Sequence, residues 1–478
     1  MKRIISFILC FLLVLNFGVV LASAEEINGT WGTLNWVLDA EGTLTISGKG
    51  KINEINPYND EAWSLYAEDI KTVIIENGVT YIGNRAFYDC SNLTDVTLAD
   101  SVFAIGDEAF SSCNKLKNAP ISNSIAHIGK DAFWGCHSLT SVTVSDSVQY
   151  IGNSPFNYCK SLTSINVSEA NTHYYAVDGV LFCKDTSTLV QYPMSKTNTS
   201  YTIPEGTVTI GEFAFLKNTN LTDVTMPDSL TTVSKGAFSG CKSLESAIVG
   251  DNVTTIGNNA FNDCSSLKTV TLGNKVTLID DFAFNECYDL ESLNLGSSVT
   301  TIGQYAFSSC ESLKHVTIPD SVVTIKEGAF SSCNGLESVI FGNNLKTIGK
   351  NAFIWCNALT KIIIPDNVTT IENMAFYDCD RLDYLYYTGS EEQWNAITIG
   401  PDSFYILEEN HFFNYSPEAG DANMDGVVDN LDAVSVLKYS VDILYLTEAS
   451  LNAADINGDG IADNLDAALI LKHDAGLI

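Results

Sequence analysis

Two short stretches near the end of the chain carry acidic and amide side chains at the spacing of a calcium-binding loop. Such a loop supplies oxygen ligands from positions 1, 3, 5, 7 and 12, often with a water at position 9, and needs glycine at position 6. Both stretches fit, and they begin 34 residues apart. The pattern predicts two Ca²⁺ ions. The predicted ligands are Asp421, Asn423, Asp425, the Val427 carbonyl, Asp429 and Asp432, then Asp455, Asn457, Asp459, the Ile461 carbonyl, Asp463 and Asp466.

Each loop leads into an amphipathic segment, 433–439 or 467–473, that is expected to be a helix. Neither loop shows a clear helix before it, and position 12 is aspartate where an EF-hand normally has glutamate. In these respects the segment 420–478 resembles the dockerin type I module. The resemblance implies calcium-dependent docking to a cohesin module of a scaffoldin, which is the assembly step of cellulosomes and belongs to polysaccharide degradation.

The resemblance also implies which residues choose the partner. Dockerins read their cohesin largely through loop positions 10 and 11 and helix positions 17 and 18. Here these are Asn430, Leu431, Leu437 and Lys438, and again Asn464, Leu465, Leu471 and Lys472. The two sets are identical, which implies a face that docks in either of two orientations. Leu431 and Leu465 replace a hydroxyl pair common in some dockerins, so the cohesin class stays open.

Upstream of these loops, one phrase recurs at a fixed period. It reads Ile-Gly-x-x-Ala-Phe-x-x-Cys, and within each of two groups its phenylalanines are 23 residues apart. A Leu-x-x-Val-x-Leu strand phrase follows each copy, then a turn and a second short extended phrase. We interpret the Ala-Phe-x-x-Cys stretch as one helical or 3₁₀ turn. The phenylalanines are Phe87, Phe110, Phe133 and Phe156, then Phe215, Phe238, Phe261, Phe284, Phe307, Phe330, Phe353 and Phe376.

These repeats resemble the BspA-like leucine-rich repeat family of bacterial surface and secreted proteins. The fold class expected is a repeat solenoid with a strand and a short helical turn per 23-residue coil, followed by a small all-α calcium-binding domain. Stacked coils bury each other's apolar face, so the phenylalanines should form a ladder inside the solenoid. The segments 31–36 and 42–48 resemble the family's N-terminal β segment, and 388–394 resembles its closing segment.

One interval departs from the period. Phe156 and Phe215 are 59 residues apart, which leaves 36 inserted residues. Asp178-Gly179 lies between two apolar runs and predicts a β-hairpin. Two interpretations remain, an ordinary variant coil and a dedicated binding loop.

Side chains for catalysis are hard to find. Eleven of the thirteen cysteines fall at one repeat position, where a small buried thiol is expected rather than a metal or redox site. The six histidines form no metalloprotease motif, and no nucleophile elbow or phosphate loop appears. Carboxylates such as Asp100, Asp228 and Asp320 recur with the coil and are expected to serve turns. We therefore predict that the chain is not an enzyme.

The N-terminus predicts an exported protein, and the composition argues against nucleic-acid binding. The chain has 58 acidic and 25 basic residues, and such a surface repels nucleic acid. Lys2 and Arg3 precede an apolar run that ends in a small-residue cleavage pattern, which is typical of a signal peptide. No membrane insertion is expected after its removal. The predicted segments are 1–24 signal peptide, 25–78 N-terminal cap, 79–388 solenoid with an insert at about 168–205, 389–415 C-terminal cap, 416–419 linker and 420–478 dockerin.

The sequence thus predicts a secreted, non-catalytic component that docks on a scaffoldin and presents the solenoid as a protein- or glycan-binding arm. Two alternatives remain open. The chain could be a free or cell-surface adhesin in which calcium is a structural staple, or an unrecognised glycoside hydrolase. The ligand of the solenoid and the oligomeric state are left undetermined.

Overall fold

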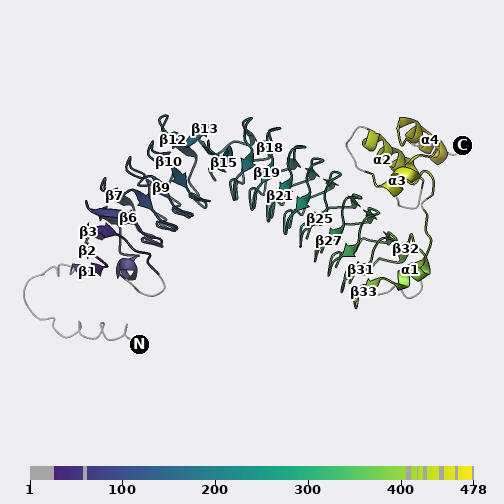
Figure 1. Cartoon of the computed structure of the whole chain (residues 1–478), viewed down its shortest axis with the longest axis horizontal. Helices are drawn as coiled ribbons and strands as arrows, with labels where there is room; N and C mark the ends of the chain where they lie inside the picture. Colours follow the sequence, from purple (N-terminus) through teal and green to yellow (C-terminus); the bar gives the residue numbers. More distant parts are fainter. Residues whose placement is uncertain are drawn as a thin grey trace, which may run out of the picture.

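The computed structural model describes residues 26–56, 62–404, 411–416, 418–423, 428–440, 446–457 and 461–475. The expected signal peptide lies outside these residues. A β-solenoid of about 14 turns forms a long arch, and a small helical domain follows it (Figure 1). Within the described residues, no helix has the length and apolar character needed to cross a membrane.

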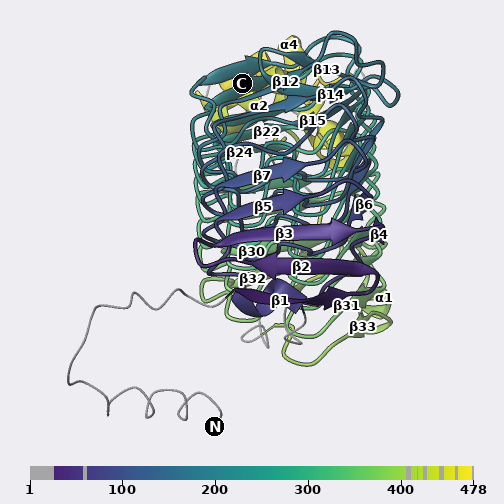
Figure 2. The same ribbon diagram turned by 90° about the vertical axis from the view of Figure 1, so that its left-hand side faces the viewer.

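Most coils contribute one strand to each of two ladders on different sides of the solenoid. Strands β3, β5 and β7 lie one above another on one side (Figure 2). The first series is β1 (Ile27–Trp31), β2 (Leu34–Leu38), β3 (Thr43–Gly48), β5 (Thr72–Ile75), β7 (Asp95–Leu98), β10 (Ser141–Val144), β12 (Ser164–Val167), β16 (Ser200–Thr202), β18 (Asp223–Thr225), β20 (Ser246–Ile248), β22 (Thr269–Thr271), β24 (Ser292–Asn294), β26 (His315–Ile318), β28 (Ser338–Phe341), β30 (Lys361–Ile364), β32 (Tyr384–Tyr387) and β34 (His411–Phe412).

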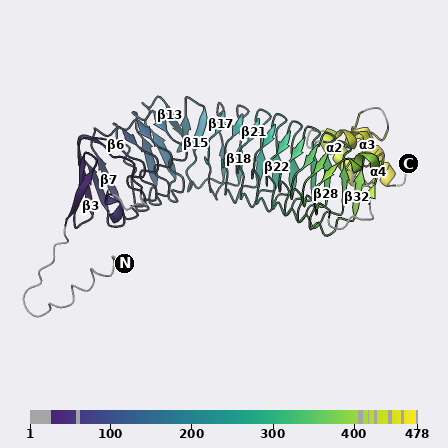
Figure 3. The same cartoon turned by 60° about the horizontal axis from the view of Figure 1, so that its bottom comes forward.

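The second ladder is a five-stranded sheet followed by a 12-stranded one, and its short parallel strands recur from coil to coil along the arch (Figure 3). The five are β4 (Gly50–Lys51), β6 (Val79–Ile82), β8 (Ala104–Ile105), β9 (His127–Ile128) and β11 (Tyr150–Ile151). The twelve are β13 (Tyr174–Val177), β14 (Val180–Cys183), β15 (Thr188–Gln191), β17 (Thr209–Ile210), β19 (Thr232–Val233), β21 (Thr255–Ile256), β23 (Leu278–Ile279), β25 (Thr301–Ile302), β27 (Thr324–Ile325), β29 (Thr347–Ile348), β31 (Thr370–Ile371) and β33 (Thr398–Ile399).

The repeat phrase that we expected to be helical forms a series of tight turns instead. In one coil, the Ala260 N–H donates to Gly257 O and the Cys264 N–H to Phe261 O, which closes two four-residue turns. Asn259 and Asp263 adopt positive φ angles of 57° and 58°, which a helix does not allow. The Phe261 N–H turns outward along the stack and donates to Ala283 O of the next coil at 2.7 Å. The solenoid fold class is confirmed, and its turn region runs as a third hydrogen-bonded line between coils.

The phenylalanines stack in the core as predicted, but in two groups. Within each group, neighbouring rings stack with centroids 4.6–5.7 Å apart. Trp63 extends the first group at 5.9 Å from Phe87, and Tyr192 begins the second at 4.9 Å from Phe215. Among the described rings none stacks on Phe156 from the far side. The ladder is therefore interrupted at the insert, where one hydrophobic core gives way to another.

The insert contains the predicted hairpin. Strands β13 and β14 pair antiparallel with Val177 opposite Val180, and Asp178 and Gly179 form the turn with φ angles of 56° and 74°. These positive angles suit a two-residue hairpin turn. Strand β15 then pairs with β17 in parallel and returns the chain to the regular stack. The interpretation as a variant coil accounts for this backbone.

Both ends of the solenoid are closed by a different element. At the start, β1, β2 and β3 form an antiparallel sheet whose last strand pairs with β5 of the first coil. The 3₁₀ helix η1 (Ala62–Tyr66) places Trp63 in the core with no exposed surface. At the other end, helix α1 (Glu391–Asn395) is capped by Ser390 and packs Trp394 against Tyr387. These elements cover end coils that have only one neighbour.

The repeat cysteines are buried free thiols. From the second copy onward, each thiol donates to the carbonyl oxygen of the phenylalanine 26 residues earlier, as Cys264 does to Phe238 at 3.2 Å. Burial raises the pKa of the Cys159 and Cys241 thiols to about 12. A thiol whose pKa is raised in this way stays protonated and is a poor nucleophile and metal ligand. The prediction of a structural thiol slot is confirmed.

Candidate calcium-binding and docking site

The C-terminal domain consists of helices α2 (Asn430–Ser440), α3 (Glu448–Ala454) and α4 (Asn464–Asp474). Helix α2 packs against α4, and Ser440 Oγ of α2 donates to Asn464 Oδ1 of α4 at 2.9 Å. The small core between the helices holds apolar side chains from both halves, among them Ala433, Val436, Ala467 and Ile470. The two halves of the domain thus contribute the same two positions to one core.

Helix α3 corrects the expectation that neither loop follows a helix. It ends at Ala454, and Asp455, the first residue of the second loop, is its C-cap. The Thr447 side chain caps its N-terminus by accepting from the Ser450 N–H at 3.0 Å. The only sign of α3 in the sequence is the N-capping threonine, Thr447. One capping residue is a weak signal for a helix of only seven residues.

The two predicted position-12 aspartates have the same surroundings. Asp432 has no exposed surface, and its two carboxylate oxygens accept from the Asn423 N–H at 2.9 Å and the Asp429 N–H at 2.8 Å. Asp466 is equally buried and accepts from the Asn457 N–H at 3.2 Å and the Asp463 N–H at 2.9 Å. Each carboxylate therefore ties together positions 3, 9 and 12 of its own loop.

The position-9 aspartates begin the helices. Asp463 is the N-cap of α4, and its Oδ1 accepts from the Leu465 N–H at 2.7 Å. Asp429 makes the matching bond with the Leu431 N–H, also at 2.7 Å. A carboxylate at this position satisfies a free helix N–H and the helix dipole. The loop residues are thus held by the helices that follow them.

The donor set fits calcium as far as the structure describes it. Asp421, Asp432 and Asp466 are fully buried, and a divalent cation would balance the negative charge that they concentrate in a small domain. The ligand candidates Asp425, Val427 and Asp459 lie outside the described residues. Among those that are described, no three His, Cys, Asp or Glu side chains converge to form a metal cluster.

The eight predicted partner-binding residues lie on the surface in two matching sets. Leu431 and Leu465 are 54% and 56% exposed, and Leu437 and Leu471 are 41% and 44% exposed. Asn430, Lys438, Asn464 and Lys472 are exposed as well. Exposed leucines on a small domain are typical of a surface that a partner covers. Sequence reasoning missed Val434, which adds another exposed apolar side chain on α2.

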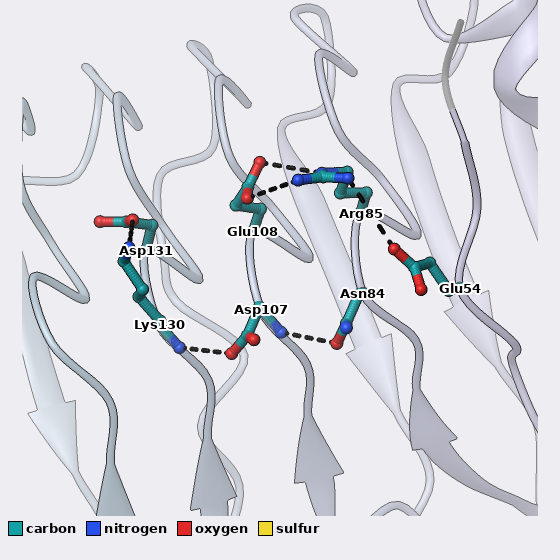
Figure 4. Close-up of polar contacts among 7 residues, drawn as sticks. All are labelled: Glu54, Asn84, Arg85, Asp107, Glu108, Lys130 and Asp131. Atoms are coloured by element: carbon teal, nitrogen blue, oxygen red, sulfur yellow. Dashed lines mark hydrogen bonds and ion pairs between the residues drawn. The ribbon is translucent and has the colours of Figure 1, made fainter.

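The solenoid has a second concentration of carboxylates, shown in Figure 4, and it serves the stack. The Arg85 guanidinium donates to both oxygens of Glu108 at 3.0 and 2.9 Å, and Asp107 Oδ1 accepts from the Lys130 N–H at 2.7 Å. Burial raises the pKa of Asp131, with Lys130 opposing the shift and Glu108 and Asp107 adding to it. A side-chain oxygen that accepts from an N–H in the next coil recurs at Asp251, Asp281 and Asp320. A repeated bond of this kind indicates turn chemistry rather than a unique catalytic pair.

Comparison with known families agrees with this division of the chain. A model of the "BspA type Leucine rich repeat region (6 copies)" matches residues 61–177, 192–314 and 300–415, and a "Dockerin type I domain" model matches residues 419–473. Dockerin type I domains bind calcium, and both kinds of module are non-catalytic. No curated protein matches the chain.

Several solved structures are similar to the solenoid. A leucine-rich repeat protein from Eubacterium ventriosum is 27% identical with a TM-score of 0.54, covering 64% of this chain and 95% of its own. A leucine-rich repeat protein from Bacteroides ovatus is 24% identical with a TM-score of 0.46, covering 76% and 98%. A leucine-rich cell surface protein from Faecalibacterium prausnitzii is 23% identical with a TM-score of 0.38, covering 79% and 99%.

Proposed function

Since this chain belongs to the BspA-type leucine-rich repeat family and carries a C-terminal dockerin type I domain, we propose that it is a non-catalytic extracellular component that docks on a cohesin-bearing scaffoldin. The dockerin attaches the protein, and the solenoid presents a binding surface for a protein or glycan. The scaffoldin places it in a cellulosome-like complex devoted to polysaccharide degradation. Extracellular location is supported by both modules and by the signal-peptide pattern at the N-terminus.

The observation that carries the proposal is the duplication of both the buried and the exposed residues of the dockerin. Asp432 and Asp466 make the same pair of backbone hydrogen bonds, and Leu431 and Leu465 have nearly the same exposure. A domain whose core alone mattered would need to repeat only the first set. The repeated exposed leucines and lysines point to a partner surface that either half can offer.

Calcium supports this surface by holding the loops. In the proposed site, one ion would be held by Asp421, Asn423, Asp425, the Val427 carbonyl and Asp432, and Asp429 would act through water. A second ion would be held by Asp455, Asn457, Asp459, the Ile461 carbonyl and Asp466, and Asp463 would act through water. The carboxylates of Asp432 and Asp466 fix the start of α2 and α4, where the exposed leucines lie. Loss of the ion would therefore disorder the docking face.

Titration of the full chain against a panel of cohesins, with calcium and with EDTA, tests the proposal. We expect tight binding to at least one cohesin, lost in EDTA and in an Asp432→Ala/Asp466→Ala variant. An Asp95→Ala/Asp223→Ala variant, which removes two exposed carboxylates of the solenoid and changes the total charge equally, is the control and should bind normally. Calcium uptake without binding to any cohesin would contradict the docking role. It would favour a free or cell-surface adhesin in which calcium is a structural staple.

The role of the solenoid is tested separately. A glycan array and a protein-interaction screen with the full chain distinguish a glycan-binding arm from a protein-binding one. Hydrolysis of plant polysaccharides by the purified chain alone would contradict the non-catalytic assignment.

A further inference from the structure

A pocket of about 300 Å³ lies at the edge of the solenoid where the insert rejoins the regular coils. Its lining comes from both sides of that joint. Lys160 precedes the insert, Ser195 lies within it, and Lys217, Thr219, Lys242 and Asp263 belong to the coils that follow. The regular stack aligns Lys217 with Asp263, two repeats apart, and Thr219 with Lys242, one repeat apart. The insert adds Ser195, which joins Lys160 to this group, so the insert completes the pocket.

The pocket concentrates positive charge in an acidic protein. Three of its lining residues are lysines, whereas the whole chain has 58 acidic and 25 basic residues. The Lys242 ammonium is paired with Asp263 at 3.1 Å. Within the described part of the chain, neither Lys160 nor Lys217 has a carboxylate in ion-pair distance. Two ammonium groups at the pocket therefore stand outside any ion pair, and the Asp263 carboxylate that shares the lining is paired with Lys242.

The position of Lys217 is set by its neighbours. Its ammonium lies 4.9 Å from the centre of the Tyr158 ring, a cation–π contact that reaches across the insert. Its stem crosses Gly240, where an added Cβ would lie 2.7 Å from Lys217 Cγ. Gly240 also has a φ of 73°, which favours glycine. The lysine is thus held in place without a carboxylate partner, which leaves its charge available for a ligand.

Hydroxyl and carboxylate groups complete the lining. Ser195 Oγ donates to the Lys160 carbonyl, which fastens the insert to the preceding coil. The Thr219 side chain is exposed at the pocket, and the Asp263 carboxylate is partly buried beside Lys242. The pocket therefore offers cationic donors together with a hydroxyl and an acceptor. A ligand that combines one anionic group with several hydroxyls matches this set.

We propose that this pocket binds a uronic acid unit of an acidic polysaccharide. Lys160 and Lys217 would pair with the sugar carboxylate, and Thr219 and Asp263 would bind its hydroxyls. The volume is at the small end of ligand pockets, which suits a single sugar unit rather than a folded protein surface. The acidic remainder of the chain opposes an anion, but its long-range field is screened beyond about 8 Å at physiological salt, so that the local lysines decide.

The test compares an oligogalacturonate with its methyl ester, by titration calorimetry with the full chain in calcium-free buffer. The ester keeps the sugar and removes the charge, and we expect it to bind at least about tenfold more weakly, since one charge-assisted pair contributes on the order of 1.4 kcal/mol or more. The Lys160→Gln/Lys217→Gln variant should lose the acid ligand by a similar factor. Because calcium is absent, failure of this experiment leaves the dockerin proposal untouched.

A Lys115→Gln/Lys275→Gln variant is the matched control. These two lysines donate to asparagine side chains of the preceding coil and lie outside the pocket, and the variant changes the total charge equally. It should bind the oligogalacturonate as the parent does. Three results would each overturn the proposal. They are equal binding of the acid and its ester, equal losses of affinity in the two variants, and binding of poly-glutamate as tight as that of an oligogalacturonate of the same charge. The comparison of acid with ester needs no variant, so an unstable variant would not prevent the test.

Discussion

The solenoid and the dockerin are both built from repeats, but they repeat different things. In the solenoid the repeated residues face inward, such as the stacked phenylalanines and the buried cysteines. Repeated outward residues there return to the backbone, as the Thr277 and Thr300 hydroxyls do to carbonyls of the preceding coil. In the dockerin, exposed Leu431 and Leu465 are repeated along with buried Asp432 and Asp466.

This difference separates residues kept for folding from residues kept for recognition. A buried repeat is required wherever identical coils must stack. An exposed leucine has no such requirement and reduces solubility, so its exact duplication needs another cause. Docking to a partner supplies that cause in the dockerin. In the solenoid, recognition has to be sought where the repeat is broken, as at the insert.

The largest expected effect is an alkaline loss of stability confined to the solenoid. Burial raises the thiol pKa values, for Cys159 and Cys241 to about 12, whereas the unfolded thiols keep the ordinary value of 9.0. Between pH 9 and 12 only the unfolded state ionises, so stability present below pH 9 is lost as pH rises. In this pH range each buried thiol lowers the free energy of unfolding by about 1.4 kcal/mol per pH unit. Denaturant unfolding at pH 8 and pH 10 measures this loss.

The dockerin serves as the internal control for that experiment, because residues 420–478 contain no cysteine. Its unfolding transition should lack this contribution. If the solenoid transition does not move between the two pH values, the thiols are accessible to solvent. The repeated cysteines would then not be buried residues of the fold.

Removing one inward repeat residue should have the next largest effect. Phe261 has no exposed surface and stacks on Phe238 and Phe284, each at 5.0 Å. We expect Phe261→Ala to lower the free energy of unfolding by roughly 3–5 kcal/mol, since the cavity has neighbours on both sides. The exposed Ile248, 63% accessible, is the control, and Ile248→Ala should cost less than about 0.5 kcal/mol. A loss below about 1 kcal/mol for Phe261→Ala would contradict the ladder.

Calcium removal should affect the dockerin alone. At a calcium concentration a hundredfold above Kd, each bound ion stabilises the folded domain by about 2.7 kcal/mol, and EDTA removes this. Helical circular dichroism during thermal unfolding should show the dockerin transition falling while the solenoid transition stays in place. Equal shifts of both transitions, or no shift of either, would argue against calcium sites in the two loops.

Sequence alone could predict the repeat but not its exceptions. The Ala-Phe phrase identifies Phe261 and its counterparts, whereas Trp63 and Tyr192 join the same stack without that phrase. Their place follows from how the cap and the insert fold, which depends on contacts far apart in the chain. The pocket at Lys160 and Lys217 escapes sequence reasoning for the same reason, because the insert supplies part of its lining.

In the dockerin, by contrast, the sequence alone predicts the candidate site residues. Its predicted calcium ligands follow from loop spacing, because calcium loops are local in sequence. Its predicted partner residues follow from the resemblance to dockerin type I modules. Two short elements differ from the prediction. The repeat turn of the solenoid is predicted to be helical but is not, and helix α3 of the dockerin is not predicted. In elements this short, tertiary contacts outweigh local propensity.

The most direct test of the role of the two exposed leucines, Leu431 and Leu465, is the cohesin affinity of three variants. It is measured by titration calorimetry with calcium present. Leu431→Asp and Leu465→Asp each damage one of two equivalent orientations and should weaken binding only about twofold, a loss of roughly 0.4 kcal/mol. The double variant damages both and should weaken binding at least about a hundredfold. A single variant that abolishes binding would contradict the two-orientation account, and a double variant that binds normally would remove the leucines from the docking face.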